Sequence, residues 1–238
     1  MTDHRIVSHE AWLQTRIALL KEEKAFTEAR DRLNAQRRAL PWERVEKDYR
    51  FKSEGGTKSL SDLFDGRSQL IVYHFMYGPT MELGCPHCSF WADNFNDAIV
   101  HMNHRDITMI AVSRGPLAKL SAYKKRMGWT FTWASSEGND FNFDYRVSAT
   151  PEETERKKME YNYVTGDMAH TEREGVSVFF KDKDGALYHT YSTYARGIDL
   201  LNTAYNYIDL TPKGRDEGGN PQFWVRGYDE YEDAGRVG

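Results

Sequence analysis

Two cysteines, separated by two residues, are the most reactive feature of this 238-residue sequence, and no other cysteine is present. They lie in the motif Cys85-Pro86-His87-Cys88. A thiolate is the attacking species in disulfide exchange, and a second thiol one helical turn away can resolve the mixed disulfide that forms. We therefore predict a thiol–disulfide oxidoreductase with Cys85 as nucleophile and Cys88 as resolving thiol.

The surroundings of the motif favour this chemistry. An apolar run at 69–76, typical of a strand buried on both faces, comes before it, and a helical pattern at 89–103 follows. A helix N-terminus presents unpaired N–H groups and positive potential, which lower the pKa of a thiol. Pro86 suits the first turn because it lacks an N–H. A protonated His87 would stabilise the thiolate, so we place both residues in the catalytic site.

Three residues outside the motif are candidates for substrate contact. Trp91 can line a pocket beside the thiols, and Glu82 can accept a proton just before the motif. Arg114 follows a second buried strand, at the carboxyl end of the sheet, where open α/β sheets bind ligands. The ordinary alternatives are a core tryptophan, a solvated loop carboxylate and an arginine that faces away from the site.

Metal binding is the main alternative use of the cysteines. The missing ligands would be histidines, and the nearest in sequence are His74, His87, His101 and His104. Only two residues separate the last two, fewer than the three to five of a usual zinc finger, and a buried strand is not a finger's context. In this alternative the chain is a non-catalytic binding protein. We expect no cofactor, since no glycine-rich nucleotide loop is present.

A peroxiredoxin-type mechanism is not predicted. Peroxiredoxins carry Pro seven residues and Thr or Ser three residues before the peroxidatic cysteine. Gly78 and Glu82 occupy those positions before Cys85, whereas Met81 and Cys85 occupy them before Cys88. Neither register fits.

The order of the elements predicts an α/β core with parallel strand pairing, because strands and helices alternate around the motif. The hairpin signal is Asp184-Gly185 between two strand-like runs. In chain order, the predicted elements are an edge strand at 44–51, strands at 69–76, 107–113 and 131–134, helices at 89–103 and 116–127, a hairpin of 176–181 with 186–191, and a final helix at 198–207.

The two ends of the chain are predicted to lie outside this core. Residues 1–43 form a helical extension, with Ser8 as its cap and apolar residues such as Ile17 at helical spacing. The extension packs either on the core or on a partner subunit, and we expect a homodimer. The core domain is 44–210, and the Gly-, Asp- and Arg-rich segment 211–238 is an irregular tail.

The composition of the chain limits the classes of partner that it can bind. There are 32 Lys and Arg against 36 Asp and Glu, a net charge of −4, which argues against a nucleic-acid-binding surface. No apolar run approaches the roughly 18 residues of a membrane span. The N-terminus lacks a hydrophobic signal core, so we expect a cytoplasmic protein. The expected partner is a disulfide or small thiol substrate, without nucleic acid or membrane.

The sequence also resembles known families. The CxxC at a strand-to-helix junction is similar to that of thioredoxin-fold proteins, and its Pro-His pair is like that of the disulfide oxidase DsbA. Nearly the whole chain resembles a bacterial thioredoxin-like family catalogued as a domain of unknown function, DUF899. The matching stretches include LPWERVEKDYRF, LSDLFDGRSQLIVYHFMYGP, GCPHCSFWADNFN, VSRGPLAKLSAYKKRMGW, GVSVFFKD and HTYSTYARGIDLLNTAYNYIDLTPKGRDE.

The resemblance implies a thioredoxin- or alkyl-hydroperoxide-reductase-like fold, with helices flanking a central sheet, and a dithiol–disulfide activity. One departure stands out. Thioredoxins carry a cis-proline just before the strand that faces the active cysteines, whereas this sequence has Gly175 or Val176 there. The departure favours a substrate other than a generic protein disulfide, or metal binding.

Overall fold

The computed structural model describes residues 4–232, and its chain divides into two compact units, Met1–Pro41 and Trp42–Gly238. Residues 1–3 of the predicted extension and 233–238 of the predicted tail lie outside the described residues. Each unit is described by itself.

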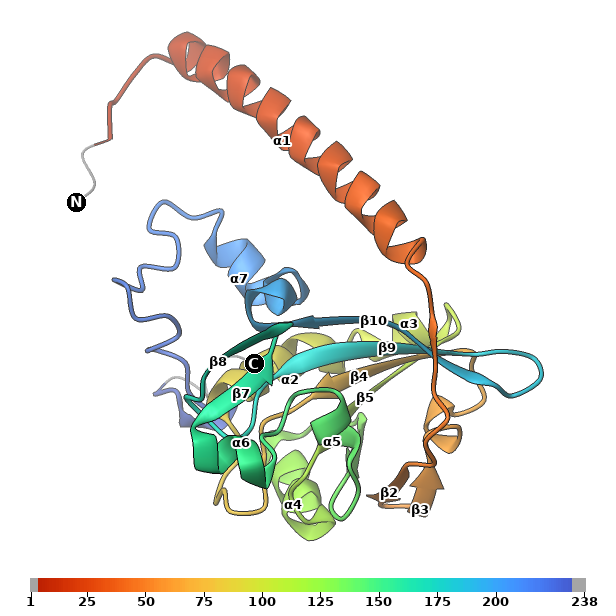
Figure 1. Ribbon diagram of the computed structural model, residues 1–238. Coiled ribbons are helices and arrows are strands. Elements are labelled where there is room, and N and C mark those ends of the chain that lie inside the picture. The colour runs from red at the N-terminus through yellow and green to blue at the C-terminus, as the bar shows by residue number, and fades with distance from the viewer. Residues whose placement is uncertain (1–3, 233–238) are drawn as a thin grey trace. The chain divides into compact units, whose positions relative to one another are not determined.

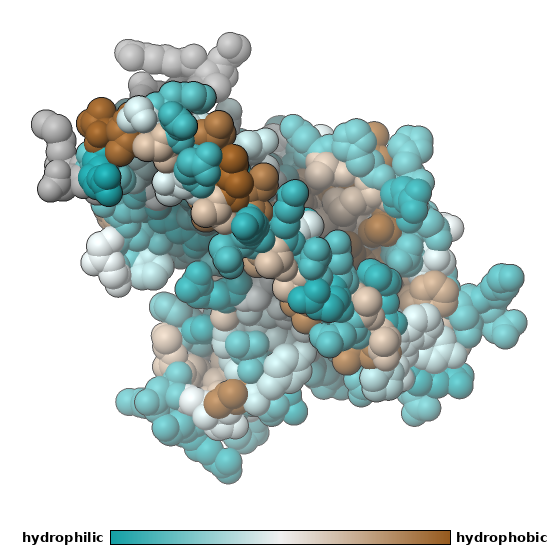
Figure 2. Space-filling model, turned by 90° about the horizontal axis from the view of Figure 1, so that it is seen from above, coloured by the Kyte–Doolittle hydropathy of each residue, from teal (hydrophilic) through white to brown (hydrophobic). Residues whose placement is uncertain are grey.

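The first unit is one helix, α1 (His9–Arg38), shown in red to orange in Figure 1. It begins as expected, because the Ser8 side chain accepts a hydrogen bond from the backbone N–H of Ala11. None of its residues is buried. Apolar side chains (brown) stand among hydrophilic ones along it in Figure 2, and the exposed set includes Trp12, Leu13, Ile17, Leu19, Leu20, Phe26 and Leu33.

The second unit is built on an eight-stranded mixed sheet in the order β1-β10-β9-β4-β5-β6-β2-β3. Its central strand β4 pairs in parallel with β5, which pairs in parallel with β6, and β4 pairs antiparallel with β9 of the β9–β10 hairpin. The strands are β1 (Glu43–Arg44), β2 (Arg50–Ser53), β3 (Gly56–Ser59), β4 (Gln69–His74), β5 (Ile107–Ser113), β6 (Thr132–Ser135), β9 (Gly175–Lys181) and β10 (Leu187–Tyr194). This is the thioredoxin-like α/β arrangement that the sequence predicts.

The helices of this unit are mostly short, and several lie beside the sheet in Figure 1. The buried strand and helix patterns around the cysteine motif are confirmed, except that the helix predicted at 89–103 begins earlier and is broken in two. The helices are η1 (Asp62–Phe64), α2 (Pro86–Asn96), α3 (Ile99–Asn103), α4 (Leu117–Met127), α5 (Phe141–Asp144), α6 (Pro151–Arg156), η2 (Ala195–Leu201), α7 (Thr203–Ile208) and η3 (Tyr228–Glu230).

The sheet has an apolar cluster on each face, because successive side chains of a strand point to opposite faces. One cluster joins Tyr73 and Phe75 to α2, α4 and η2 through Trp91, Leu120 and Ile198. The other joins alternate residues of β4 and β5 to η1 and α5, and includes Val72, Ile110, Phe64, Phe141 and Phe179. The first of these clusters contains Cys88 and therefore underlies the cysteine motif.

The predicted edge strand at 44–51 is wrong. Glu43–Arg44 pairs with β10 at one edge of the sheet, whereas Arg50–Ser53 pairs with β3 near the other. The chain between them is held by side chains instead of a strand ladder. The Tyr49 hydroxyl and the Lys47 ammonium donate to Asp144 at 2.6 and 2.8 Å.

A further hairpin was missed by the sequence analysis. Strands β7 (Lys158–Tyr161) and β8 (Val164–Asp167) form a separate two-stranded sheet. Asn162 and Tyr163 both have positive φ at its turn, 52° and 65°. Tyrosine in that conformation is not a turn signal, so the pattern did not reveal the hairpin.

The last part of the chain has little regular secondary structure, but some of its side chains pack in the core. The predicted helix at 198–207 is a 3₁₀ segment, η2, followed by α7, whose cap Asn202 accepts from the Tyr205 N–H. Beyond it, Val225 is buried and Trp224 packs against the cysteine-containing core cluster. Within residues 4–232 no helix is long and apolar enough to cross a membrane.

Candidate functional site

The cysteine motif lies at the N-terminus of α2, as predicted. Cys85 is the N-cap residue, Pro86 opens the helix, and Cys88 is 2% exposed. The space beside Gly84 admits no side chain, because a Cβ there would lie 2.9 Å from the Tyr123 ring. The motif therefore combines one partly exposed and one buried sulfur at a helix N-terminus.

The pKa of the Cys85 thiol is lowered from its ordinary value. The largest cause is a hydrogen bond from the Cys88 thiol, and the backbone N–H groups of Cys88 and His87 add to it. Burial and the nearby carboxylate of Glu174 oppose the shift. Cys85 is thus the more acidic sulfur of the pair.

Cys88 has the opposite character. Burial raises the pKa of its thiol well above the ordinary value, and the neighbouring Cys85 sulfur adds to the shift. The Met76 backbone N–H donates to the Cys88 sulfur at 3.4 Å, which opposes it. Cys88 is therefore a protonated thiol that donates toward Cys85.

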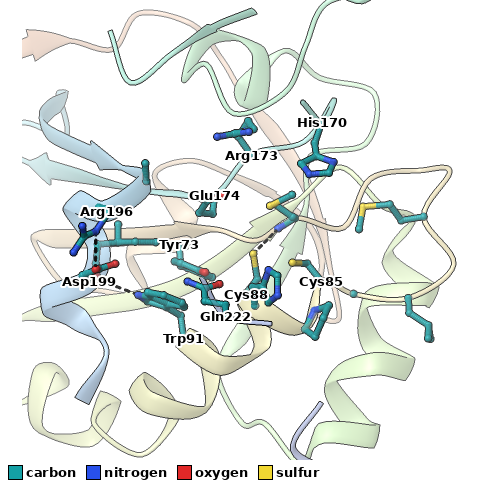
Figure 3. Close-up of a pocket in the computed structure, with 18 residues that line it drawn as sticks. Tyr73, Cys85, Cys88, Trp91, His170, Arg173, Glu174, Arg196, Asp199 and Gln222 are labelled. Atoms are coloured by element: carbon teal, nitrogen blue, oxygen red, sulfur yellow. Dashed lines mark hydrogen bonds and ion pairs between the residues drawn. The ribbon is translucent and has the colours of Figure 1, made fainter. Parts of the chain in front are cut away.

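Both cysteines line a cavity of about 570 Å³. Its walls come from distant parts of the chain: α2, the end of β4, the segment before β9, η2 and the segment after α7. Figure 3 shows His170, Arg173 and Glu174 on the side of the cavity across from the cysteines. The remaining labelled walls are Tyr73, Trp91, Arg196, Asp199 and Gln222.

Of the residues predicted to lie beside the cysteines, only some line the cavity. Trp91 lines the cavity, and its indole N–H donates to the Ile198 carbonyl at 3.0 Å. His87 also lines the cavity, but partial burial lowers the pKa of its imidazole. Its ring is therefore mainly neutral at pH 7, and what it gives the Cys85 thiolate is its backbone N–H.

Glu82 and Arg114 are not among the residues that line the cavity. The Glu82 side chain is exposed. The backbone carbonyl of Glu82 accepts a hydrogen bond from the Tyr77 hydroxyl. The Arg114 guanidinium pairs with the buried Glu172 carboxylate at 2.9 Å and lies over the Phe143 ring. An arginine so occupied stabilises the fold at this position and is not part of the cavity wall.

Other residues of the cavity were missed by the sequence analysis. Tyr73 lies on β4, and Arg173 and Glu174 come just before β9, where thioredoxins have the cis-proline. Residues 4–232 contain no cis peptide bond. The only sequence signal for the missed residues was the missing proline before the strand at 176–181. Its absence did not indicate which residues would face the cysteines instead.

Of the four histidines considered as metal ligands, His87 alone lines the cavity with the cysteines. His74 is buried against the Phe141 and Tyr145 rings of the other core cluster, and its Nε2 lies 2.8 Å from the Ser177 hydroxyl. His101 and His104 lie in α3 and at its C-cap. Among the described residues, no three His, Cys, Asp or Glu side chains are placed to hold one metal ion.

The model of the family described as "Bacterial protein of unknown function (DUF899)" matches residues 1–231. The chain belongs to the DUF899 family. This confirms the resemblance found in its sequence. No curated protein matches this DUF899 chain at a significant level.

Several solved structures match part of this chain at low sequence identity. A mutant of PrxQ from Xylella fastidiosa is 16% identical, with 71% of this chain and 96% of that chain covered and a TM-score of 0.41. The bacterioferritin comigratory protein of Xanthomonas campestris is 15% identical, with 68% and 94% covered and a TM-score of 0.43. The mitochondrial 2-Cys peroxiredoxin of Plasmodium falciparum is 16% identical, with 72% and 95% covered and a TM-score of 0.42.

Proposed function

We propose that this DUF899 protein is a thiol–disulfide oxidoreductase that uses Cys85 and Cys88. The observation that carries the proposal is the division of roles between the sulfurs. The pKa of Cys85 is lowered at the helix N-terminus, whereas that of buried Cys88 is raised, and both line one cavity. Such a pair has a ready nucleophile and a protonated second thiol beside it.

The reaction follows from these roles. The Cys85 thiolate attacks one sulfur of a substrate disulfide, the substrate S–S bond breaks, and the first thiolate leaves and takes up a proton. Cys88 then loses its proton to solvent and attacks the Cys85 sulfur. The mixed disulfide breaks, and the second substrate thiolate leaves. The dithiol is oxidised to a disulfide, and the substrate is reduced to two thiols.

A redox titration against glutathione mixtures of defined ratio tests this proposal. We expect a single two-electron midpoint potential. The fraction of free thiols at each glutathione ratio is measured by alkylation. Cys85→Ser should abolish exchange, whereas Cys88→Ser should accumulate a mixed disulfide on Cys85. A dithiol that shows no defined midpoint, or exchange that survives in Cys85→Ser, would refute the assignment.

We propose further that the protein works in the cytoplasm, where dithiols are kept reduced, and that two copies associate through α1. The support for association is that Leu13, Ile17 and Leu20 recur on one face of a helix in which no residue is buried. A second copy of α1 would cover these side chains.

A further inference from the structure

The dithiol cavity contains two opposite charges that are not used in ion pairs. Arg173, Glu174, Arg196 and Asp199 are its charged lining residues. The Asp199 carboxylate is paired with Arg196 at 3.3 Å and with Arg215 at 3.1 Å. Within residues 4–232, neither Arg173 nor Glu174 has an ion-pair partner within 4.0 Å. The cavity therefore offers one free cation and one free anion.

Tyr161, from the β7–β8 hairpin, contacts both of these charged residues. The Arg173 guanidinium lies over its ring, 4.2 Å from the centre. The single hydrogen of the Tyr161 hydroxyl is shared between the Glu174 backbone carbonyl at 2.8 Å and the Glu174 carboxylate at 3.1 Å. Two consecutive residues of opposite charge thus contact one side chain, and both line the cavity.

A weakly satisfied hydrogen-bond donor also lines the cavity. The Tyr73 side chain is 1% exposed and lines the cavity beside the cysteines. Its hydroxyl has no partner with full hydrogen-bond geometry among the described residues, and its interaction with the Cys88 sulfur contributes to the raised pKa of Tyr73. A sulfur is a weak acceptor, so a ligand group that accepts this hydrogen better would be bound favourably there.

We propose that the substrate is a small disulfide that carries an α-amino-acid group, and this rests on the proposed function. The Arg173 guanidinium binds the carboxylate, the Glu174 carboxylate binds the ammonium, and the Tyr73 hydroxyl donates to an acceptor close to the reacting sulfurs. The volume of the cavity, about 570 Å³, is that of a small-molecule site. Exchange then oxidises Cys85 and Cys88 and releases two amino-acid thiols.

Four small disulfides separate these contacts. Cystine carries both charged groups, cystamine only ammonium groups, 3,3′-dithiodipropionate only carboxylates, and 2-hydroxyethyl disulfide neither. Reduced full-length protein is mixed with each in a single-turnover experiment followed by tryptophan fluorescence, since Trp91 lines the cavity. Every rate is divided by the rate with 2-hydroxyethyl disulfide, which cancels changes in the reactivity of the thiols.

We expect cystine to react fastest after this division, by about tenfold or more over cystamine or 3,3′-dithiodipropionate, each of which carries only one kind of charged group; tenfold is the size of one charged hydrogen bond. Arg173→Gln should remove the advantage of carboxylates and leave that of ammonium groups. Glu174→Gln should do the reverse. Arg173→Lys, which keeps the charge, should restore part of the carboxylate preference, and the exposed Arg156→Gln is the matched control.

Tyr73→Phe provides a measurement that does not depend on charge. It removes only the hydroxyl, so the fold is retained, and we expect a slower reaction with cystine and an unchanged charge preference. Equal normalised rates for all four disulfides in the wild type would overturn the proposed substrate and leave the dithiol activity standing. Failure of all four to oxidise the protein would overturn the dithiol activity itself.

Discussion

The backbone of Met76 contacts both cysteines: its N–H donates to the Cys88 sulfur at 3.4 Å, and its carbonyl accepts from the Cys85 N–H at 3.2 Å. Met76 follows the central strand β4, so these two hydrogen bonds fix the start of α2 to the end of that strand. The positions of the sulfurs are therefore set by the sheet as well as by the helix. Their reactivity is also coupled, because each sulfur affects the pKa of the other.

The coupling leads to the first prediction. Cys88→Ala removes the hydrogen bond that lowers the pKa of Cys85 most, so the pKa of Cys85 should rise toward that of free cysteine. Cys88→Ser keeps a hydroxyl donor and should give an intermediate value. The ultraviolet absorbance of the thiolate, followed against pH in the reduced protein, measures both. An unchanged Cys85 pKa in the alanine variant would show that the backbone N–H groups alone determine it.

The sequence predicts the position of a site residue well when neighbouring residues in the chain determine it. It predicts the position poorly when pairing with a distant segment determines it. Cys85 and Cys88 were placed correctly at the start of a helix because an apolar run, a proline and a helical pattern are adjacent in sequence. Glu174 reaches the same cavity only because β9 pairs antiparallel with β4, in the register that sets Gly175 opposite His74. No short sequence pattern fixes that register, so Glu174 was missed.

The same reason explains the errors elsewhere. The alternating residues at 44–51 predict a strand, but Lys47 and Tyr49 are held by the side chain of Asp144, which is distant in sequence. Arg114 was placed at the correct end of the sheet, but it pairs with Glu172 and does not line the cavity. Local patterns predicted the elements better than they predicted the partners of individual side chains.

A partly buried carboxylate on α2, that of Asp93, gives the second prediction. Burial raises the pKa of Asp93 to about 6, although Trp129 donates a hydrogen bond to it at 2.7 Å. Because the folded-state pKa is above the unfolded one, the stabilising effect of the protonated group is lost as the pH rises from 3.8 through about 6. Asp93→Asn keeps an acceptor for Trp129 and removes the charge.

We therefore expect Asp93→Asn to raise the free energy of unfolding at pH 8, by up to about 3 kcal/mol, and to change it little at pH 4. Urea denaturation at both pH values measures the difference. Asp97→Asn, at the C-cap of the same helix, is a control. A variant less stable than the wild type at pH 8 would mean that the ionised carboxylate is favourable to the fold.

The third prediction concerns α1. A helix of 30 residues with no buried side chain gains little stability from its own apolar face. If a second copy covers that face, Ile17→Asp should give a monomeric mass by light scattering at micromolar concentration, where the wild type gives a dimer. Glu22→Gln, an exposed polar position of the same helix, should leave the mass unchanged. A monomeric wild type would exclude association through α1.

The fourth prediction comes from a buried chain of polar side chains that crosses the sheet. His74 contacts Ser177 at 2.8 Å, Ser177 contacts Ser192 at 2.8 Å, and Ser192 contacts the Nε2 of His189 at 2.7 Å. The Nδ1 of His74 has no partner among residues 4–232. Burial, with a smaller effect of His189, lowers the pKa of His74 to about 3. The imidazole is therefore neutral throughout the physiological pH range.

This depressed pKa makes the fold sensitive to acid. The unfolded chain binds the proton near pH 6.5 and the folded chain only near pH 3, so stability contributed by the neutral imidazole is present above pH 6.5 and lost as the pH falls toward 3. The loss amounts to about 4 kcal/mol over that window. His74→Gln can still bond to Ser177 but cannot be protonated there, so its free energy of unfolding should fall less between pH 7 and pH 4. The exposed His101→Gln should keep the wild-type slope, and parallel slopes for all three proteins would show that His74 is not the acid-sensitive group.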